Sequence, residues 1–405
     1  MATASISFAP LLPFLEDCLG TEYSVNSDDI GCNSHAQIFR VEQRDSPDLK
    51  RKTPKYDGVV MKTPRNTGAV LALARESTIL ETIAGLFPLS VPCHCREGAQ
   101  NTPPSSSPFE HSIYIPKLIR LEPSGLRPSP DMRDNCSNIQ LTELLPGRNL
   151  AAIFPQLSFD EKMDTIQLLA DTLIRLHSLD IPRVVATDLL RGFQIPLPCQ
   201  HRQVATLSSR EWLRCTLDTV LMPRLKDHPL FLTGSDSVSV ESRGNKRTSR
   251  PFEAQKVFEA VDTIETYARK PDTDSYWSRF GSRESVLLHG DFMLPNILLS
   301  HTQAAETGYR KDKPHWYVSG LVDWGDCTIG DRRYDLSACV WSIRFNARLC
   351  GVNEKGADAL AEAFLDRYSR LLHNKNDTPT QFRLITQEDL RPWRAVYELY
   401  GFLYY

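Results

Sequence analysis

The sequence predicts an α+β protein with a small β-rich N-terminal lobe and a larger helical C-terminal lobe. Up to about residue 145, the apolar segments are short and rich in β-branched residues, which is typical of strands. After about residue 155, apolar residues recur every three or four positions over long segments, which is typical of amphipathic helices. We therefore expect two domains, residues 1–145 and residues 146–405, with a nucleotide in the cleft between them.

The composition is that of a soluble globular protein. Of the 405 residues, 41% are hydrophobic and 24% are charged, and the formal net charge is −3. Since Lys and Arg are not in excess, nucleic acid is not an expected partner. No apolar run approaches the ~20 residues that span a bilayer, and the first basic residue is Arg40, too late for a signal peptide. We expect a cytoplasmic protein without a membrane partner; its oligomeric state is left open.

The N-terminal lobe is expected to contain four short strands and one helix. The helix is expected over residues 69–84, and the strands are Ala36–Val41, Gly58–Met61, Ile113–Ile115 and Ile139–Leu141. The segment before the first strand is not a glycine-rich phosphate loop, but it contains small polar residues. Ser34 is the residue at which we expect backbone amides to approach nucleotide phosphates.

Lys62 and Glu76 are expected to form a buried ion pair. Lys62 follows a short apolar strand, and Glu76 falls in the apolar stripe of the helix over residues 69–84. An unpaired carboxylate there would be costly, and an ammonium partner removes that cost. The alternative is a slightly rotated helix, with Glu76 at its edge and Lys62 in water. We favour the pair because two motifs further along the chain require a phosphate-binding lysine.

A hinge is expected after the last strand of the N-terminal lobe. The strand at residues 139–141 is followed closely by Pro146 and Gly147, which break it. An extended hinge exposes one backbone N–H and one C=O to the edge of an adenine. From their position alone, we expect these groups to be the Thr142 carbonyl and the Leu144 N–H.

The C-terminal lobe is expected to be mostly helical. Ser158 and Glu161 have the spacing of a capping box, with a helix after them. A second helix should begin at Asp335 as its N-cap and end near Gly351. A third should cover residues 355–372. A serine-, glycine- and basic-rich stretch over residues 233–251 is expected to be a solvated loop whose role is left open.

The most informative segment contains His289-Gly290-Asp291, with Asn296 five residues after the aspartate. Its spacing matches the loop H-R-D-x-x-x-x-N of phosphoryl-transfer enzymes, with glycine in place of arginine. The Asp291 carboxylate can accept or orient the proton of an attacking hydroxyl. The Asn296 amide oxygen can bind Mg²⁺ without placing a second full charge beside that base.

A second motif, Asp323-Trp324-Gly325, follows an apolar pair and has the form of a metal-binding D-F-G. A carboxylate oxygen at Asp323 suits a hard cation that bridges nucleotide phosphates. The polar segment between the motifs predicts a hairpin that brings Asp291 and Asp323 near one metal. Asp335 is expected mainly to cap a helix and to brace the amides of the Asp291 loop, with direct chemistry as the alternative.

These motifs resemble the aminoglycoside phosphotransferase and choline-kinase-like superfamily, which has a protein-kinase-like fold. The similar segments are HGDFMLPNILL, VDWGDCTIGDRRYDLS, GCNSHAQIFRVE and LIRLHSLD, and the first looks most like aminoglycoside 3′-phosphotransferases. The resemblance implies ATP-dependent phosphorylation of a small-molecule hydroxyl. It implies that Asp291 is the catalytic base and that Asn296 and Asp323 bind Mg²⁺. It also implies that Lys62, paired with Glu76, holds the ATP phosphates.

The departures from the family concern the acceptor. Where drug-resistance members carry an acidic pair, this chain has Phe345 and Asn346, and its last residues are rich in aromatics. We hypothesise an acceptor less charged than an aminoglycoside that stacks on aromatic rings, although such aromatics can also be core residues. A protein kinase is disfavoured because no A-P-E motif follows Asp323. The remaining alternative is a catalytically inactive nucleotide-binding pseudokinase or scaffold.

Overall fold

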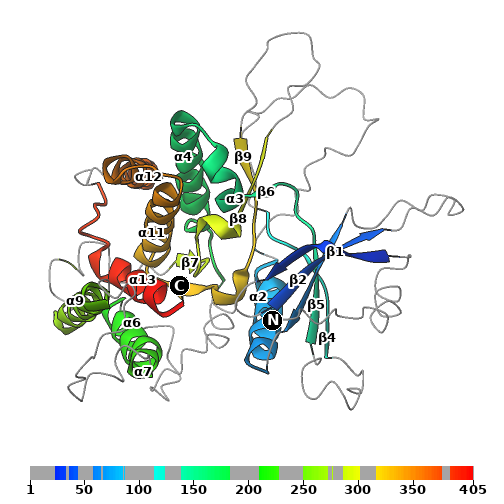
Figure 1. The fold of residues 1–405 in the computed structure, drawn as a ribbon, viewed down its shortest axis with the longest axis horizontal. Helices are drawn as coiled ribbons and strands as arrows, with labels where there is room; N and C mark the ends of the chain where they lie inside the picture. Colours follow the sequence, from blue (N-terminus) through cyan, green and yellow to red (C-terminus); the bar gives the residue numbers. More distant parts are fainter. Residues whose placement is uncertain are drawn as a thin grey trace, which may run out of the picture. The chain divides into compact units, whose positions relative to one another are not determined.

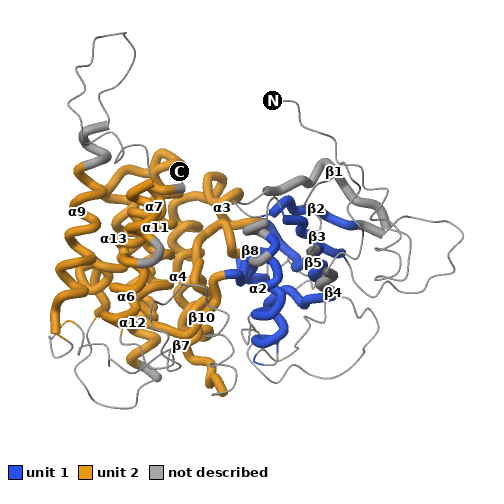
Figure 2. Tube along the Cα trace, turned by 90° about the horizontal axis from the view of Figure 1, so that it is seen from below, with its two compact units in different colours: residues 1–148, 298–325 blue, residues 149–297, 326–405 orange. Residues whose placement is uncertain are grey.

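The protein forms two compact units that alternate along the chain (Figure 2). The first unit comprises Met1–Arg148 and Leu298–Gly325, and the second comprises Asn149–Ile297 and Asp326–Tyr405. The computed structural model describes residues 23–32, 36–43, 58–64, 67–84, 86, 114–123, 138–182, 209–227, 250–271, 276, 286–301, 316–375 and 384–404. The expected domains are divided once, after residue 145. In the structure, Leu298–Gly325 also belongs to the first compact unit. The expected division into functional lobes stays a prediction.

The first unit is built on a five-stranded antiparallel sheet in the order β1-β2-β3-β5-β4 (Figure 1). Helix α2 (Thr67–Ala84) packs against β3, β4 and β5 of this sheet. The strands are β1 (Tyr23–Cys32), β2 (Ala36–Gln43), β3 (Val59–Pro64), β4 (Leu118–Pro123) and β5 (Asn138–Glu143). The apolar side chains of α2 and the sheet, among them Leu73 and Met61, form the buried core of this unit.

The prediction of a strand at Ile113–Ile115 is wrong for Tyr114 and Ile115, the two residues of it that the structure describes. Residues 114–117 are not in a strand, and β4 begins at Leu118. Pro116 lacks the N–H group that a ladder position requires, so pairing starts only after it. The other three expected strands are confirmed: two of them are longer than expected, and β3 begins one residue later, at Val59, and ends at Pro64. The expected helix over residues 69–84 is also confirmed.

Two smaller sheets complete the β structure of the described residues. One has the order β6-β8-β9, with β6 (Arg148–Asn149), β8 (Ile297–His301) and β9 (Trp316–Leu321). The other pairs β7 (Val286–Leu288) with β10 (Thr328–Gly330) in antiparallel register, within the second unit. The His289-Gly290-Asp291 motif begins directly after β7, so the β7–β10 pair positions its start.

The second unit is mainly helical (Figure 1). Its helices are α3 (Leu150–Ile153), α4 (Phe159–Leu176), α6 (Ser209–Cys215), α7 (Met222–Lys226), α9 (Arg250–Arg269), α11 (Arg333–Leu349), α12 (Glu354–Lys375) and α13 (Arg391–Tyr404). Helix α11 packs against both α12 and α13, while α4 packs on α12 and α9 on α13. Together with the small antiparallel sheet of the first unit, these helices confirm the predicted α+β class.

The helix ends show which capping predictions hold. The capping box is confirmed, since Glu161 N–H donates to Ser158 Oγ at 3.2 Å and Ser158 N–H donates to Glu161 Oε2 at 2.8 Å. The prediction that Asp335 caps α11 is wrong, because the helix begins two residues earlier at Arg333. There, Asp331 accepts the Arg333 N–H at 2.9 Å. Gly351, at φ +78°, follows the end of α11 as expected.

Two further expectations concern the length of chain elements. The third helix, expected over residues 355–372, is confirmed as α12. Residues 233–249 of the expected loop lie outside the described residues, and α9 begins at Arg250. Among the described helices, none is both long and apolar enough to cross a bilayer.

Candidate active site

The loop from His289 to Asn296 is shaped by a glycine that no other residue can replace. It follows β7, whose three residues are all buried. Gly290 has φ +84°, and a Cβ atom there would lie 1.9 Å from the Asp326 carbonyl oxygen. Only glycine combines that backbone angle with so close an approach. The glycine that replaces the arginine of the kinase loop is therefore a packing requirement of this chain.

Helix α11 holds this loop at two points, one near each end. The Asp335 carboxylate is fully buried and accepts the backbone N–H groups of His289 at 2.8 Å and Gly290 at 2.9 Å. Two turns further along α11, Ser342 Oγ accepts the Leu294 N–H at 3.0 Å. The expectation that Asp335 braces the loop amides is confirmed.

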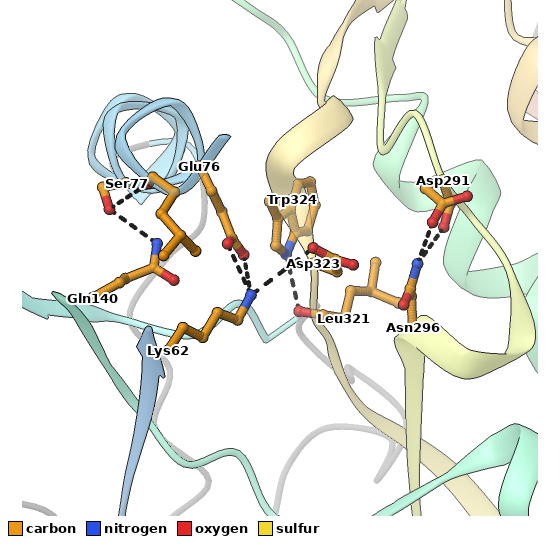
Figure 3. Close-up of polar contacts among 10 residues, drawn as sticks. Lys62, Glu76, Ser77, Gln140, Asp291, Asn296, Leu321, Asp323 and Trp324 are labelled. Carbon is orange, nitrogen blue, oxygen red and sulfur yellow. Dashed lines mark hydrogen bonds and ion pairs between the residues drawn. The ribbon is translucent and has the colours of Figure 1, made fainter. Parts of the chain in front are cut away.

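Asp291 and Asn296 form a hydrogen-bonded pair within the loop (Figure 3). Asn296 Nδ2 donates to Asp291 Oδ2 at 2.7 Å and to the Asp291 carbonyl at 3.0 Å. Because the amide nitrogen faces two acceptors, the amide oxygen must face away from Asp291. On the other side of the turn, Asn149 donates to the Pro295 carbonyl and so ties the loop to the start of α3.

A buried histidine extends the support of the loop, and the sequence analysis assigned it no role. His177 Nδ1 lies 2.7 Å from the Tyr368 hydroxyl, and its Nε2 lies 3.3 Å from Asp335 Oδ2. Burial lowers the pKa of His177 despite the Asp335 carboxylate, so its ring is neutral at pH 7. Its signals in the sequence were its position after the apolar stripe of α4 and its place in the family-like segment LIRLHSLD.

The ion pair expected between Lys62 and Glu76 is present in the first unit (Figure 3). Lys62 Nζ lies 2.7 Å from Glu76 Oε1 and 2.8 Å from Oε2, and both residues are buried. Asp323 Oδ1 lies 3.9 Å from the same ammonium. We call Lys62, Glu76 and Asp323 the Lys62 cluster.

The Lys62 cluster has more negative than positive charge. Burial by itself would lower the pKa of Lys62, but Glu76 and Asp323 outweigh it, so the pKa is raised and the ammonium stays charged. Burial raises the pKa of Glu76, and Asp323 adds to that rise against the pull of Lys62. Two carboxylates thus share one ammonium, which makes a further cation beside Asp323 favourable.

The backbone of Asp323 has an unusual conformation. Asp323 is the one non-glycine residue of the described chain with positive φ, at 64°, and 36% of its side chain is exposed. Such a conformation is uncommon outside glycine and costs free energy, so the surrounding structure must hold it. Directly after it, the buried Trp324 ring donates Nε1–H to the Leu321 carbonyl at 2.9 Å, which anchors the turn.

The prediction for the adenine edge is wrong for both groups. Leu144 N–H donates to the Gly58 carbonyl at 3.0 Å and is therefore occupied. Because backbone groups on one side of a strand repeat every two residues, the Thr142 carbonyl also faces β3, where Thr142 pairs with Val60. Among the described residues, the first N–H after this pairing that makes no hydrogen bond belongs to Leu145.

The remaining site residue of the sequence analysis, Ser34, lies outside the described residues. The described residues contain no group of three or more His, Cys, Asp or Glu side chains that could hold a metal by themselves. Mg²⁺ does not need such a group, because it is usually bound through one or two protein oxygens together with substrate phosphates and water. The oxygens of Asp323 and Asn296 are of the type that it prefers.

Comparisons with known proteins show relatives of one kind. An 88-residue segment is 32% identical to the probable aminoglycoside 3′-phosphotransferase of Lactococcus lactis subsp. lactis (strain IL1403). It covers 22% of this chain and only 25% of that relative. An aminoglycoside phosphotransferase structure from Streptomyces rimosus is 15% identical with a TM-score of 0.43, covering 97% of this chain and 98% of that chain.

A macrolide 2′-phosphotransferase structure from Brachybacterium faecium is 14% identical with a TM-score of 0.45, covering 97% of this chain and 88% of that chain. The family model matches a longer part of the sequence than the 88-residue segment does. The family model described as "Phosphotransferase enzyme family" matches residues 109–384, which contain both the Asp291 loop and the Asp323 motif. That match extends over more than half of the chain, so this protein belongs to the phosphotransferase enzyme family.

Proposed function

We propose that the protein uses ATP and Mg²⁺ to phosphorylate a hydroxyl group of a small molecule. Its acceptor is an aminoglycoside-like compound or another hydroxylated metabolite. The observation that carries the proposal is the Asp291–Asn296 pair. It combines a carboxylate with an amide oxygen directed away from it, on a loop braced by a buried aspartate.

Asp291 is the proposed catalytic base. In phosphoryl transfer the protein mainly positions the reactants and stabilises charge, so the base has to be fixed rather than strongly basic. The Asn296 amide donates to one oxygen of the Asp291 carboxylate. Two hydrogen bonds from the loop amides to Asp335 fix the backbone before it. These contacts support the role of a carboxylate that orients the hydroxyl of the acceptor.

Asn296 and Asp323 are the proposed ligands of Mg²⁺. Both offer hard oxygen donors, and the excess negative charge of the Lys62 cluster favours a cation at Asp323. When bound, Mg²⁺ neutralises the charge that develops on the transferred phosphoryl group. Lys62, held by Glu76, is the proposed contact to the nucleotide phosphates. The Leu145 N–H is the proposed donor to the adenine edge.

The test measures phosphate transfer from ATP to a library of hydroxylated compounds, comparing the wild type with Asp291→Asn. We expect the substitution to lower kcat by about 10²–10⁴-fold, which is the usual contribution of a positioned base, while ATP binding is retained. Asp218→Asn makes the same chemical change at an exposed site in the second unit and should leave turnover unchanged.

A different result would favour the alternative function. If the wild type binds ATP but shows no turnover above Asp291→Asn with any acceptor, the protein is a nucleotide-binding pseudokinase or scaffold. Omission of Mg²⁺ gives a second check, because turnover should then fall to the level of the Asp291→Asn variant.

A further inference from the structure

Helix α11 carries an apolar stripe that runs from a half-buried tryptophan to an exposed leucine. Trp341, Phe345 and Leu349 follow each other at intervals of four residues and therefore lie on one face of the helix. Trp341 is half-buried, Phe345 is 37% exposed and Leu349 is 70% exposed. We call these three residues the α11 stripe. Large apolar side chains that reach the surface next to one another form a patch, and such patches mark binding surfaces more often than scattered apolar residues do.

The aromatic part of the stripe is already ordered. The Trp341 and Phe345 rings are stacked, with centroids 5.1 Å apart and planes inclined by 8°. On the other side, a Cβ atom at Gly401 of α13 would lie 3.0 Å from Trp341 Cζ2, so the indole lies close against the α13 backbone. A ligand that stacks here meets rings that are already held in place, which reduces the entropy lost on binding.

The α11 stripe lies on the helix that holds the Asp291 loop. Ser342, the neighbour of Trp341, accepts the Leu294 N–H from the Asp291 loop. Met293 of that loop is half-buried and packs with Trp341 against the same hydrophobic core. These contacts lie within the second unit. An acceptor resting on the stripe would therefore present its hydroxyl groups close to Asp291.

The charges of the two helices do not suit a polycation. The acidic residues of α11 and α13 are Asp335 and Glu398 alone. Asp335 is fully buried under the loop, and Glu398 is already 3.6 Å from Arg394 Nη2. Arg344 adds positive charge within one turn of the stripe, and its partner Asp358 belongs to α12. Neither helix therefore offers an unpaired carboxylate to a cationic acceptor.

We propose that the α11 stripe binds the acceptor, and that the acceptor is an uncharged or anionic hydroxylated compound with a flat aromatic face. The inference rests on the proposed function and names its class of substrate. Flat faces suit the stripe because aromatic rings attract one another in stacked and edge-to-face arrangements. The hydroxyl groups at the edge of the same compound would meet the Asp291 loop.

The experiment compares acceptors that differ only in the flat face. Binding of 4-nitrophenyl and methyl glucosides and galactosides, and of kanamycin as a polycation, is measured by calorimetry on the full chain with Mg²⁺ and a non-hydrolysable ATP analogue. Stacking of one ring is expected to make the aryl glycosides bind about tenfold more tightly than the methyl glycosides. Equal binding of aryl and methyl glycosides, including none by either, overturns the proposal, as does preferential binding of kanamycin.

Variants of Phe345 test whether the stripe is responsible. Phe345→Ala should remove most of the preference for the aryl glycosides, and Phe345→Glu should remove it while improving kanamycin binding. Phe258→Ala, at a 60% exposed phenylalanine of α9, is the matched control and should keep the preference. If Phe345→Ala instead changes only the oligomeric state, measured by light scattering, the stripe is a contact between copies and the proposal is wrong.

The two proposals can fail separately. If the aryl preference depends on Phe345 but the wild type transfers no phosphate, the proposed function fails and the binding surface stands. If phosphate is transferred with full dependence on Asp291 but without an aryl preference, the function stands and the inference about the stripe fails.

Discussion

The Lys62 cluster and the Asp291 loop hold their polar groups in opposite ways. In the cluster, side chains hold one another, with two carboxylates on a single buried ammonium. In the loop, a buried carboxylate of α11 holds backbone amides, and the glycine between them accepts a positive φ. The first arrangement depends on charge, whereas the second depends on the path of the backbone.

This difference shows what each region tolerates. A buried ion pair is very sensitive to the loss of one partner, because the other remains as an uncompensated charge. A loop held through its amides is insensitive to side chains that point away, but it is sensitive to any atom that displaces the backbone. Substitutions in the two regions should therefore fail for different physical reasons.

The largest effect is expected from Lys62→Met in the cluster. It leaves the Glu76 carboxylate buried without its ammonium and should destabilise the protein by about 3–5 kcal/mol at pH 7. The destabilisation should shrink as the pH falls, because Glu76 becomes protonated and neutral. Chemical denaturation at several pH values measures this. Lys117→Met, at an exposed lysine of the first unit, is the control, and an equally small effect at both positions would contradict the charge-based description.

The wild-type pair gives the complementary pH dependence. Since the pKa of Lys62 is raised in the folded protein, its contribution to stability is complete below the ordinary value of 10.5. That contribution is lost as the pH rises above this value towards the folded pKa. Stability should therefore fall more steeply above pH 10.5 in the wild type than in Lys62→Met.

An intermediate effect is expected from Gly290→Ala in the loop. The added Cβ would meet the Asp326 carbonyl in an unfavourable backbone region, and we expect a loss of about 2–4 kcal/mol together with loss of turnover. Gly351→Ala separates the two causes, because Gly351 also has positive φ, at 78°, but a Cβ there meets nothing within 4 Å. It should cost only about 1–2 kcal/mol. Similar losses for both variants would show that the close approach to Asp326 is unimportant.

The smallest effect is expected from His177, behind the loop. Its pKa is lowered in the folded protein by burial, so its contribution to stability is present above the ordinary value of 6.5 and is lost as the pH falls below it. The loss can reach about 1.4 kcal/mol per pH unit. His177→Gln should flatten the acid side of the stability profile, measured by thermal unfolding. His301→Gln, at an exposed histidine, is the control and should show the same slope of stability against pH as the wild type.

The sequence predicted the fold best where short-range patterns determine the structure. The Ser158–Glu161 capping box, the helix around Glu76 and the glycine after α11 all depend on residues within one or two turns of each other. The error at β4 has a local cause, Pro116, whereas the error at the start of α11 involves a distant partner. Helix α11 begins before Asp335 because that carboxylate is needed at the amides of residues 289 and 290, which are far away in the chain.

The same distinction between short-range patterns and distant partners applies to the candidate site. The Lys62–Glu76 pair was predicted from a charge in an apolar stripe together with the two motifs further along the chain, all of which a sequence displays. The hydrogen bond from the Leu144 N–H to the Gly58 carbonyl could not be predicted in this way, because it depends on the register between β3 and β5. His177 went without a role because its partners, Asp335 and Tyr368, come from two other helices.

The sequence by itself determined the residues proposed to carry the chemistry, their spacing in the two motifs and most of the helices and strands that bear them. These features depend on local backbone preferences and on the cost of burying a charge. Only the tertiary structure decided which backbone groups remain available, which carboxylate supports the Asp291 loop and which aromatic rings pack against one another. The reason is that hydrogen bonds and ring contacts between distant segments form only when packing brings those segments together.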